Sequence, residues 1–143
     1  MTAMPSLNPI GLIKTPYRTL KDCPRNIDPK GPLCELVIDK NFAGGVLGLT
    51  PGQEILVLYW FEDVDRNITS HPSRKYGGQR GVFAMRTPVR PNPIAAAVVK
   101  IENIDNGRLS VKGLDCLDGT PLLDIKPAIL KERSNILRAS RNV

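Results

Sequence analysis

Aromatic residues are scarce in this sequence, histidine occurs once, and cysteine occurs only at three scattered positions. Aromatics make up 5% of the 143 residues, so aliphatic side chains must supply most of the core. Cys23, Cys34 and Cys116 form no CxxC pair and leave an odd count, which indicates free thiols in a reducing compartment. Because His71 is the lone histidine, we expect no metal site.

Long apolar runs are also missing. No hydrophobic stretch approaches about 18 residues, and the N-terminus lacks the apolar core of a signal peptide. We therefore expect a cytoplasmic protein with no membrane segment. The length fits one domain, and 41% hydrophobic residues suffice for one core of moderate size.

Acidic residues are absent between Arg66 and Lys100, where seven basic residues occur, and the whole chain carries a net charge of +6. A solvated basic surface and a docking surface for an anionic partner both fit this pattern. Such a partner could be nucleic acid or a ligand with a phosphate or carboxylate group. Arg74, Lys75 and Arg80 lie in a polar loop and are the best candidates for contacts with RNA phosphates.

Glycine and proline are plentiful, with 12 and 13 residues, which predicts many turns and few long helices. Asn106-Gly107 is the preferred pair for a tight hairpin, so residues 97–104 are expected to pair with 108–114. Taken alone, residues 94–104 would also fit a helix. The apolar run at residues 55–61 is predicted to be a strand buried on both faces. The other expected strands are 10–13, 34–39, 81–86 and 122–126.

These strands predict a mainly β fold, a compact and mostly antiparallel barrel of six to seven strands with a short C-terminal helix or extension. We expect residues 1–8 to be disordered, residues 9–128 to form the domain, and residues 129–143 to form a C-terminal tail.

Residues 88–93, PVRPNP, form a stiff loop between two apolar stretches. Its three prolines fix φ at every second residue and remove three backbone donors, so the loop is preorganised. Arg86 and Arg90 can each donate two hydrogen bonds to a carboxylate or a phosphate. The alternative is a rigid turn whose arginines pair with carboxylates of a later segment, namely Asp115, Asp118 and Asp124.

The later segment, GLDCLDGTPLLDIKP at residues 113–127, holds those three acids within ten residues. Asp118-Gly119 is a turn signal, and Thr120-Pro121 leads into an extended segment. The acids could bind a cation or ribose hydroxyls, or they could serve turn chemistry and internal ion pairs.

Five stretches together resemble one known family. In order they are IGLIKTPY, the PRN after Cys23, LYWF, GVFAMRTPVRPNPI and GLDCLDGTPLLDIKP, which span residues 10–127. They resemble the TsaA-like proteins, also called YaeB or TrmO. The resemblance implies a compact β-barrel with a strand at residues 94–104 and S-adenosylmethionine as the cofactor. It also implies a homodimer with the cofactor near the subunit contact, and N6 methylation of threonylcarbamoyladenosine in tRNA.

The resemblance also implies which residues contact the cofactor. Arg86 would face a carboxylate such as that of the methionine moiety, and Arg90 would face an anionic substrate or pin its loop. With Arg90, the basic residues Arg74, Lys75 and Arg80 complete the expected substrate set. No catalytic base is identified. The expected cofactor contacts are Arg25, Asn26, Ile27, Glu62, Asp63, Arg86, Ala96, Leu117, Asp118, Gly119 and Thr120.

This sequence departs from the family pattern at four positions. Glu62 stands where the family often has histidine, and Ala95, Ala97 and Ala128 stand where it usually has Gly, Ser and Tyr. Longer bacterial members carry a further domain after this last motif. Two alternatives therefore remain: a methyltransferase for a small molecule or another RNA, and a non-catalytic S-adenosylmethionine-binding protein.

Overall fold

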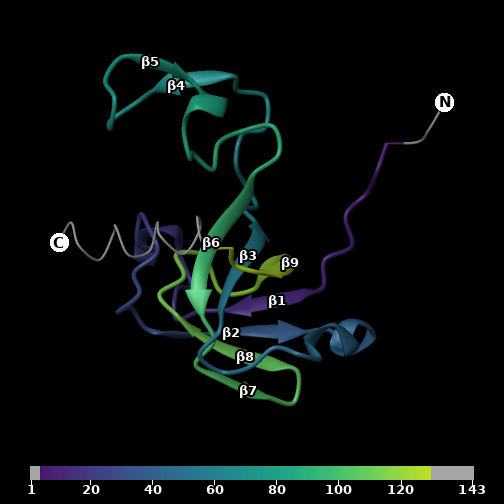
Figure 1. The fold of residues 1–143 in the computed structure, drawn as a ribbon. Helices are drawn as coiled ribbons and strands as arrows, with labels where there is room; N and C mark the ends of the chain where they lie inside the picture. Colours follow the sequence, from purple (N-terminus) through teal and green to yellow (C-terminus); the bar gives the residue numbers. More distant parts are fainter. Residues whose placement is uncertain (1–3, 130–143) are drawn as a thin grey trace.

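The computed structural model describes residues 4–129, which form a curled seven-stranded sheet and a two-stranded arm that stands off from one end (Figure 1). The strand order is β6-β3-β9-β1-β2-β8-β7, and every pairing is antiparallel. The strands of this sheet are β1 (Gly11–Lys14), β2 (Leu33–Ile38), β3 (Glu54–Trp60), β6 (Ile94–Lys100), β7 (Asn103–Asp105), β8 (Arg108–Lys112) and β9 (Thr120–Pro127).

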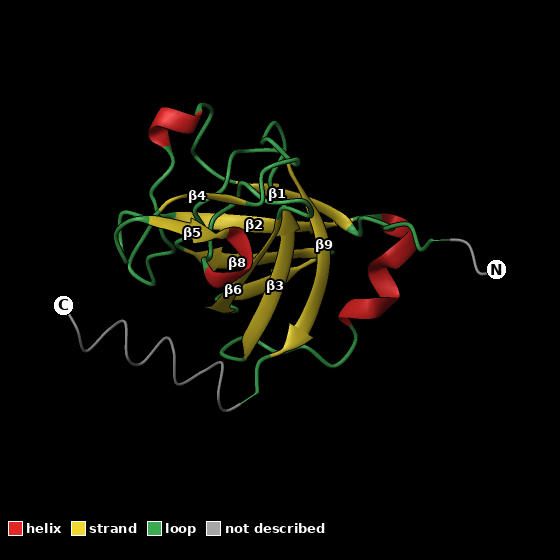
Figure 2. Cartoon of the chain, turned by 90° about the horizontal axis from the view of Figure 1, so that it is seen from above, coloured by secondary structure: helices red, strands yellow, loops and turns green. Residues whose placement is uncertain are grey.

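The curl of the sheet gives it a barrel-like shape around one apolar core. Figure 2 shows the strands crossing at different angles around this core, and β6 comes close enough to contact β8. The expected antiparallel β fold of the TsaA-like type is therefore confirmed. The expected C-terminal helix or extension falls on residues 130–143, which lie outside the described residues. Within residues 4–129, no helix has the length and apolarity needed to cross a membrane.

Burial alternates along β3. Ile55, Val57 and Tyr59 are buried in the core, whereas the residues between them are only half-buried. The expectation that this run is buried on both faces was therefore wrong. An antiparallel sheet needs to cover only one face, and Leu56, on the second face of β3, lines a hollow described below.

The segment at residues 94–104 is extended, as the resemblance implied, but its pairing differs from the expected hairpin. β6 pairs with β3 along its whole length, from Ile94↔Trp60 to Lys100↔Glu54. At Ile101 and Glu102 the chain crosses to β8, since the Ile101 N–H donates to Gln53 and the Glu102 N–H donates to Ser110. Only the short β7 then pairs with β8.

The β7–β8 turn itself is the one that the sequence predicts. Asn106 has φ 48° and Gly107 has φ 80°, the left-handed pair that a type I′ turn requires.

The arm consists of β4 (Ser70–Pro72), β5 (Gln79–Gly81) and the short helix η3 (Val82–Ala84). The expected strand at residues 81–86 was wrong, because strand pairing ends at Gly81. The Val82 N–H still donates to Thr69, and the chain then turns as the Met85 N–H donates to the Val82 carbonyl. The other short helices are η1 (Leu20–Asp22) and η2 (Lys40–Val46).

Candidate functional site

Two adjoining hollows open where the loops at one end of the sheet meet the base of the arm. The larger hollow, about 830 Å³, runs along β3 and β6, where Leu56, Tyr59 and residues 94–98 line it, and we call it the sheet hollow. The smaller one, about 480 Å³, lies against the turn before β9, and we call it the turn hollow. Five residues line both hollows and make them one continuous site, namely Arg25, Phe61, Arg86, Pro88 and Asp115.

Every residue expected to contact the cofactor lines this site. The residues come from four segments that are far apart in the sequence, and their role in binding stays a prediction. Those in the sheet hollow are Arg25, Asn26, Ile27, Arg86 and Ala96. Those in the turn hollow are Arg25, Glu62, Asp63, Arg86, Leu117, Asp118, Gly119 and Thr120.

The turn at residues 117–120 is fixed by hydrogen bonds to β1 and the loop after it. Thr15 donates its hydroxyl to the Cys116 carbonyl at 2.8 Å, and its N–H to Asp118 Oδ1 at 3.1 Å. The Asp118 N–H in turn donates to the Tyr17 carbonyl at 2.8 Å. The turn is therefore rigid before any ligand arrives, and the Asp118 carboxylate is partly used in holding it.

The loop that carries Arg25, Asn26 and Ile27 is fixed by a backbone contact at Gly113. The Asp28 N–H donates to the Gly113 carbonyl at 2.8 Å. Gly113 has φ 81°, and a Cβ at this position would overlap the Asp28 carbonyl oxygen. Only glycine lets the two backbones approach this closely.

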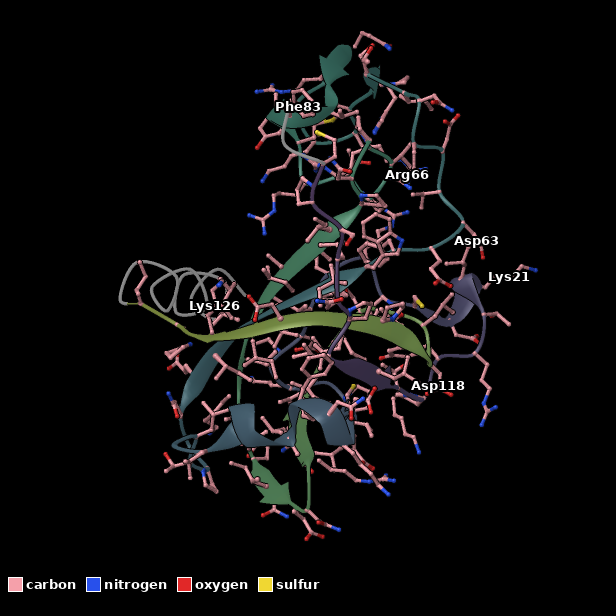
Figure 3. The ribbon with its side chains drawn as sticks, turned by 90° about the vertical axis from the view of Figure 1, so that its right-hand side faces the viewer. Lys21, Asp63, Arg66, Phe83, Asp118 and Lys126 are labelled. Atoms are coloured by element: carbon pink, nitrogen blue, oxygen red, sulfur yellow. The ribbon has the colours of Figure 1, made fainter. Side chains whose placement is uncertain are left out.

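Asp63 has a left-handed backbone conformation, with φ 59°, three residues after the strand that ends at Trp60. Such a conformation is uncommon for residues other than glycine, although aspartate tolerates it better than most. It turns the chain so that Glu62 and Asp63 line the turn hollow. Figure 3 shows Asp63 and Asp118 on the same side of the molecule.

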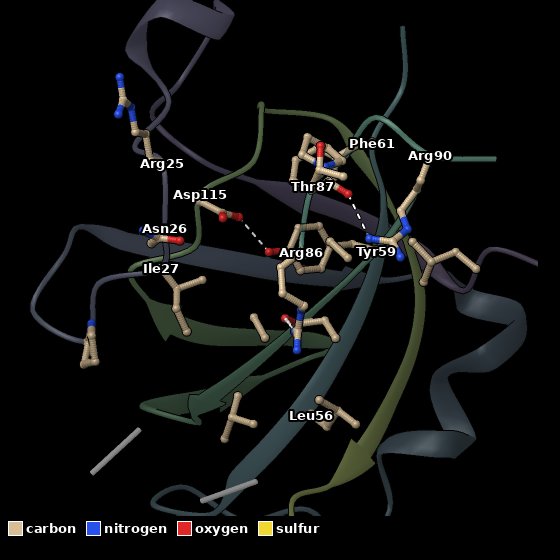
Figure 4. A pocket seen from close by; sticks show the side chains of 17 residues that line it. Arg25, Asn26, Ile27, Leu56, Tyr59, Phe61, Arg86, Thr87, Arg90 and Asp115 are labelled. Carbon is tan, nitrogen blue, oxygen red and sulfur yellow. Dashed lines mark hydrogen bonds between the residues drawn. The ribbon is translucent and has the colours of Figure 1, made fainter. Parts of the chain in front are cut away.

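The two arginines at the proline-rich loop, Arg86 just before it and Arg90 within it, make different contacts. Arg90 donates Nη1 to the carbonyl oxygens of Met85 and Thr87, both at 3.0 Å, and thereby pins the loop (Figure 4). Arg86 is exposed and makes one long hydrogen bond, 3.4 Å from its Nη2 to the Ala96 carbonyl.

The alternative of ion pairs between these arginines and the later aspartates was wrong. Among residues 4–129, the ion pairs are Arg108–Glu35 at 3.1 Å and Lys126–Asp124 at 2.9 Å. Arg90 is held by carbonyl oxygens instead, because the tight loop places them within its reach.

A tyrosine and an aspartate meet at the junction of the two hollows. The buried Tyr59 donates its hydroxyl to Asp115 Oδ1 at 2.6 Å (Figure 4). Burial raises the pKa of the Asp115 carboxyl above its ordinary value, and the hydrogen bond from Tyr59 partly opposes that rise. Burial and the nearby carboxylate raise the pKa of Tyr59, so the hydroxyl stays protonated.

Sequence reasoning missed this pair. Tyr59 looked like a strand residue and Asp115 like a partner for an arginine, and 56 positions separate them. The available signal was that both residues belong to family motifs, Tyr59 to LYWF and Asp115 to the last one.

The predicted substrate residues Arg74, Lys75 and Arg80 lie on the arm, outside both hollows. Arg74 and Lys75 are exposed. Arg80 instead stacks its guanidinium on the Tyr76 ring, 3.9 Å from the ring centre, and its Nε is buried. Phe83 protrudes from the same arm with 83% of its surface exposed (Figure 3).

One of the three thiols, Cys23, lines the turn hollow, whereas Cys34 and Cys116 line neither hollow. All three are free, and Cys34 and Cys116 are buried. Burial raises the pKa of Cys116 to about 12, which keeps this thiol neutral at physiological pH. Within the described part of the chain, no group of three His, Cys, Asp or Glu side chains could hold a metal ion.

Comparison with known proteins agrees with the arrangement of these motifs. The family model described as the tRNA-methyltransferase O N-terminal domain matches residues 12–132, which is most of the chain. The chain belongs to this TrmO family.

Its relatives in the TrmO family differ in length. A probable S-adenosyl-L-methionine-binding protein VirR from Rhizobium radiobacter is 43% identical over 118 residues, which cover 82% of this chain and 67% of VirR. A Mus musculus tRNA (adenine(37)-N6)-methyltransferase is 33% identical over 140 residues, covering 87% of this chain and 32% of the mouse protein. A crystal structure of TrmO superposes with a TM-score of 0.71 at 32% identity, and covers 89% of this chain and 58% of the TrmO chain.

Proposed function

We propose that this protein is an S-adenosylmethionine-dependent methyltransferase that methylates N6 of threonylcarbamoyladenosine in tRNA. The observation that carries the proposal is the convergence of four separate family segments on one continuous site. Membership of the TrmO family supports it, as do the names of the relatives, which include S-adenosylmethionine-binding proteins and a tRNA methyltransferase.

The residues of the turn hollow fit the chemical groups of this cofactor. Arg86 has guanidinium nitrogens free to bind a carboxylate, since it makes only one long hydrogen bond. Glu62 and Asp63 are exposed carboxylates that can accept hydrogen bonds from ribose hydroxyls or an ammonium group. Phe61 and Pro88 offer apolar surface for a purine ring, and the hollow has the usual size of a ligand site.

The cofactor supplies an activated methyl group, so the protein needs no nucleophile of its own. Its residues must instead bring the acceptor nitrogen into line with the methyl group and keep water out, and positioning then supplies most of the rate. The hydrogen bonds from Thr15 to the turn at residues 117–120, and from Arg90 to its own loop, make both walls rigid for this task.

The basic arm supports tRNA as the substrate. Arg74 and Lys75 are exposed on it, and no described acidic residue lies between Arg66 and Lys100 to neutralise them. In this proposal the protein works in the cytoplasm, where three free thiols remain reduced. It also works as a homodimer, and the exposed Phe83 offers apolar surface for the contact.

Methylation of purified tRNA tests the proposal. The protein is incubated with labelled S-adenosylmethionine and tRNA that carries threonylcarbamoyladenosine, with tRNA that lacks this modification as the control. We expect label only in the modified tRNA, at the nucleoside that mass spectrometry identifies as the N6-methylated form. Cofactor binding without label in any tRNA would favour a small-molecule methyltransferase or a non-catalytic binding protein.

A further inference from the structure

The Tyr59–Asp115 pair lies where a cofactor and an acceptor would meet. Asp115 lines both the turn hollow and the sheet hollow, and Tyr59 lines the sheet hollow next to it. Tyr59 is 1% exposed, whereas Asp115 keeps a partly open face. Tyr59 donates to Oδ1 at 2.6 Å, and the backbone N–H of Asp115 also interacts with the carboxylate. Two donors do not saturate its two oxygens, so lone pairs remain for a ligand.

Asp115 is the one carboxylate among the described residues that line the sheet hollow. That hollow also contains three arginines, Arg25, Arg86 and Arg90, which suit an anionic acceptor. The carboxylates of Glu62, Asp63 and Asp118 line only the turn hollow.

Two other candidate proton acceptors are excluded by their contacts. His71 lines neither hollow, and its ring nitrogens lie 2.9 Å from Thr87 Oγ1 and from the Pro72 carbonyl. Cys116 is fully buried. Asp115 is therefore the group best placed between the two halves of the site.

We infer that Asp115 accepts the proton from the acceptor nitrogen during methyl transfer, and that Tyr59 is the positioning residue that orients its carboxylate. This inference rests on the proposed function. The nitrogen forms a bond to the methyl carbon as the carbon–sulfur bond breaks, and the bonding electron pair stays on sulfur. The N–H proton passes to Asp115 Oδ2, and the carboxylic acid later releases it to water.

The environment of Asp115 supports this role. A carboxylate whose pKa is raised is a stronger base than an exposed aspartate, and burial has that effect here. Tyr59 keeps its proton, so it can only donate to Asp115 and cannot compete for the incoming proton. The titratable and charged groups that face Asp115 or act on it electrostatically are Tyr17, Cys23, Arg25, Tyr59, Arg86 and Cys116.

Single-turnover rates at saturating cofactor and tRNA test the inference, with Asp115→Asn as the main variant. We expect the rate to fall by about 10²- to 10⁴-fold, the usual contribution of a general base. Calorimetry should show cofactor affinity within about twofold of wild type, since no cofactor contact is assigned to Asp115. Asp105→Asn, an exposed carboxylate next to the β7–β8 turn, is the matched control and should keep the wild-type rate.

Tyr59→Phe separates positioning from a merely structural role. Loss of the donated hydrogen bond raises the pKa of Asp115 further, so the acidic limb of the pH–rate profile should move to higher pH. Carbon-13 NMR of the Asp115 carboxyl in the free protein should show the same upward shift without any turnover.

Three outcomes would overturn the inference. An Asp115→Asn protein with the wild-type rate shows that no proton passes to this residue. A cofactor affinity that falls well beyond twofold, with an unchanged rate at saturating cofactor, makes Asp115 a cofactor contact. If wild type methylates no tRNA, the proposed function fails and this role fails with it, whereas an active wild type with an insensitive Asp115 variant rejects this inference alone.

Discussion

Arg86 has a less constrained guanidinium than Arg90, because its one hydrogen bond is 3.4 Å long. We expect Arg86→Ala to weaken S-adenosylmethionine binding by about 1.5–3 kcal/mol, the range for a hydrogen bond to a charged group. Isothermal titration calorimetry measures this difference directly. Arg18→Ala removes an exposed arginine outside both hollows and serves as the control. An unchanged affinity in Arg86→Ala would assign this residue to loop structure.

Asp115 makes the stability of the free protein depend on pH. Its pKa in the folded state is raised above the ordinary value of about 3.9, so the folded state binds the proton more tightly than the unfolded state does. Relative to Asp115→Asn, wild type is therefore most stable below that ordinary value. It loses this advantage as the pH rises through the raised pKa. Melting temperatures of the two proteins, measured across this window, should show wild type falling relative to the variant. The opposite trend would mean that the fold stabilises the carboxylate.

The sequence predicts site residues well where a motif carries them and poorly where only the fold joins them. Arg25, Arg86 and Asp118 belong to motifs whose order identifies the family, and all three line the site. The hydrogen bond between Tyr59 and Asp115 depends on how β3 lies beside the segment before β9, and no local pattern encodes that relation.

At the scale of elements, the loop at residues 25–29 depends on its close approach to Gly113. We expect Gly113→Ala to unfold at a lower temperature and to lose cofactor affinity, since its Cβ would overlap Asp28 and push the loop away. Gly52→Ala is the matched control. Gly52 also has a positive φ, 91°, but a Cβ there meets nothing within 4 Å. The control should therefore show only the left-handed backbone penalty of about 1–2 kcal/mol.

Chemical denaturation and calorimetry on the two glycine variants distinguish the effects. If Gly113→Ala is no less stable than Gly52→Ala and binds the cofactor normally, the loop does not need this contact.

The arm is the element that we expect to attract tRNA. The double variant Arg74→Ala with Lys75→Ala should weaken tRNA binding. It should also reduce the slope of log binding constant against log salt concentration by about 1.4 to 1.8, because each phosphate contact contributes about 0.7 to 0.9 to that slope. Arg80 is left unchanged, since it stacks on Tyr76 and its loss would disturb the arm itself.

Lys40→Ala with Lys112→Ala removes two exposed charges elsewhere and is the control for net charge. Binding measured by fluorescence anisotropy at several salt concentrations compares the two proteins. Equal salt slopes in both double variants would show that the arm makes no phosphate contact.

The elements that the sequence predicts correctly are those whose structure depends on residues close together in the chain. The Asn106-Gly107 turn and the alternating apolar residues of β2 and β8 encode their structure within a few positions. The arm strands β4 and β5 are three residues each and lack an apolar pattern, so nothing in the sequence marked them. The partner of β6 was missed because pairing with β3 is fixed by the whole sheet and not by the nearby hairpin.

At the scale of the whole molecule, we expect two copies to associate. Light scattering at micromolar concentration should give about twice the chain mass of 15.7 kDa, because the family resemblance implies a homodimer. Phe83→Asp should shift the mass toward one chain, since Phe83 is the most exposed aromatic side chain on the arm. A wild-type mass of one chain would contradict the dimer. A dimer that tolerates Phe83→Asp would place the contact elsewhere.

The position of β9 in the sheet has a consequence for how the protein is made. This strand lies between β3 and β1, so it joins a β6–β3 half to a β1–β2–β8–β7 half, although it is the last strand to be synthesised within residues 4–129. Until Pro127 leaves the ribosome, the nascent chain can hold only two separate half-sheets, each with an open edge beside an apolar face. Folding is therefore completed only after the whole domain has been translated, and a chain that stops before Thr120 carries two half-sheets with unpaired edges.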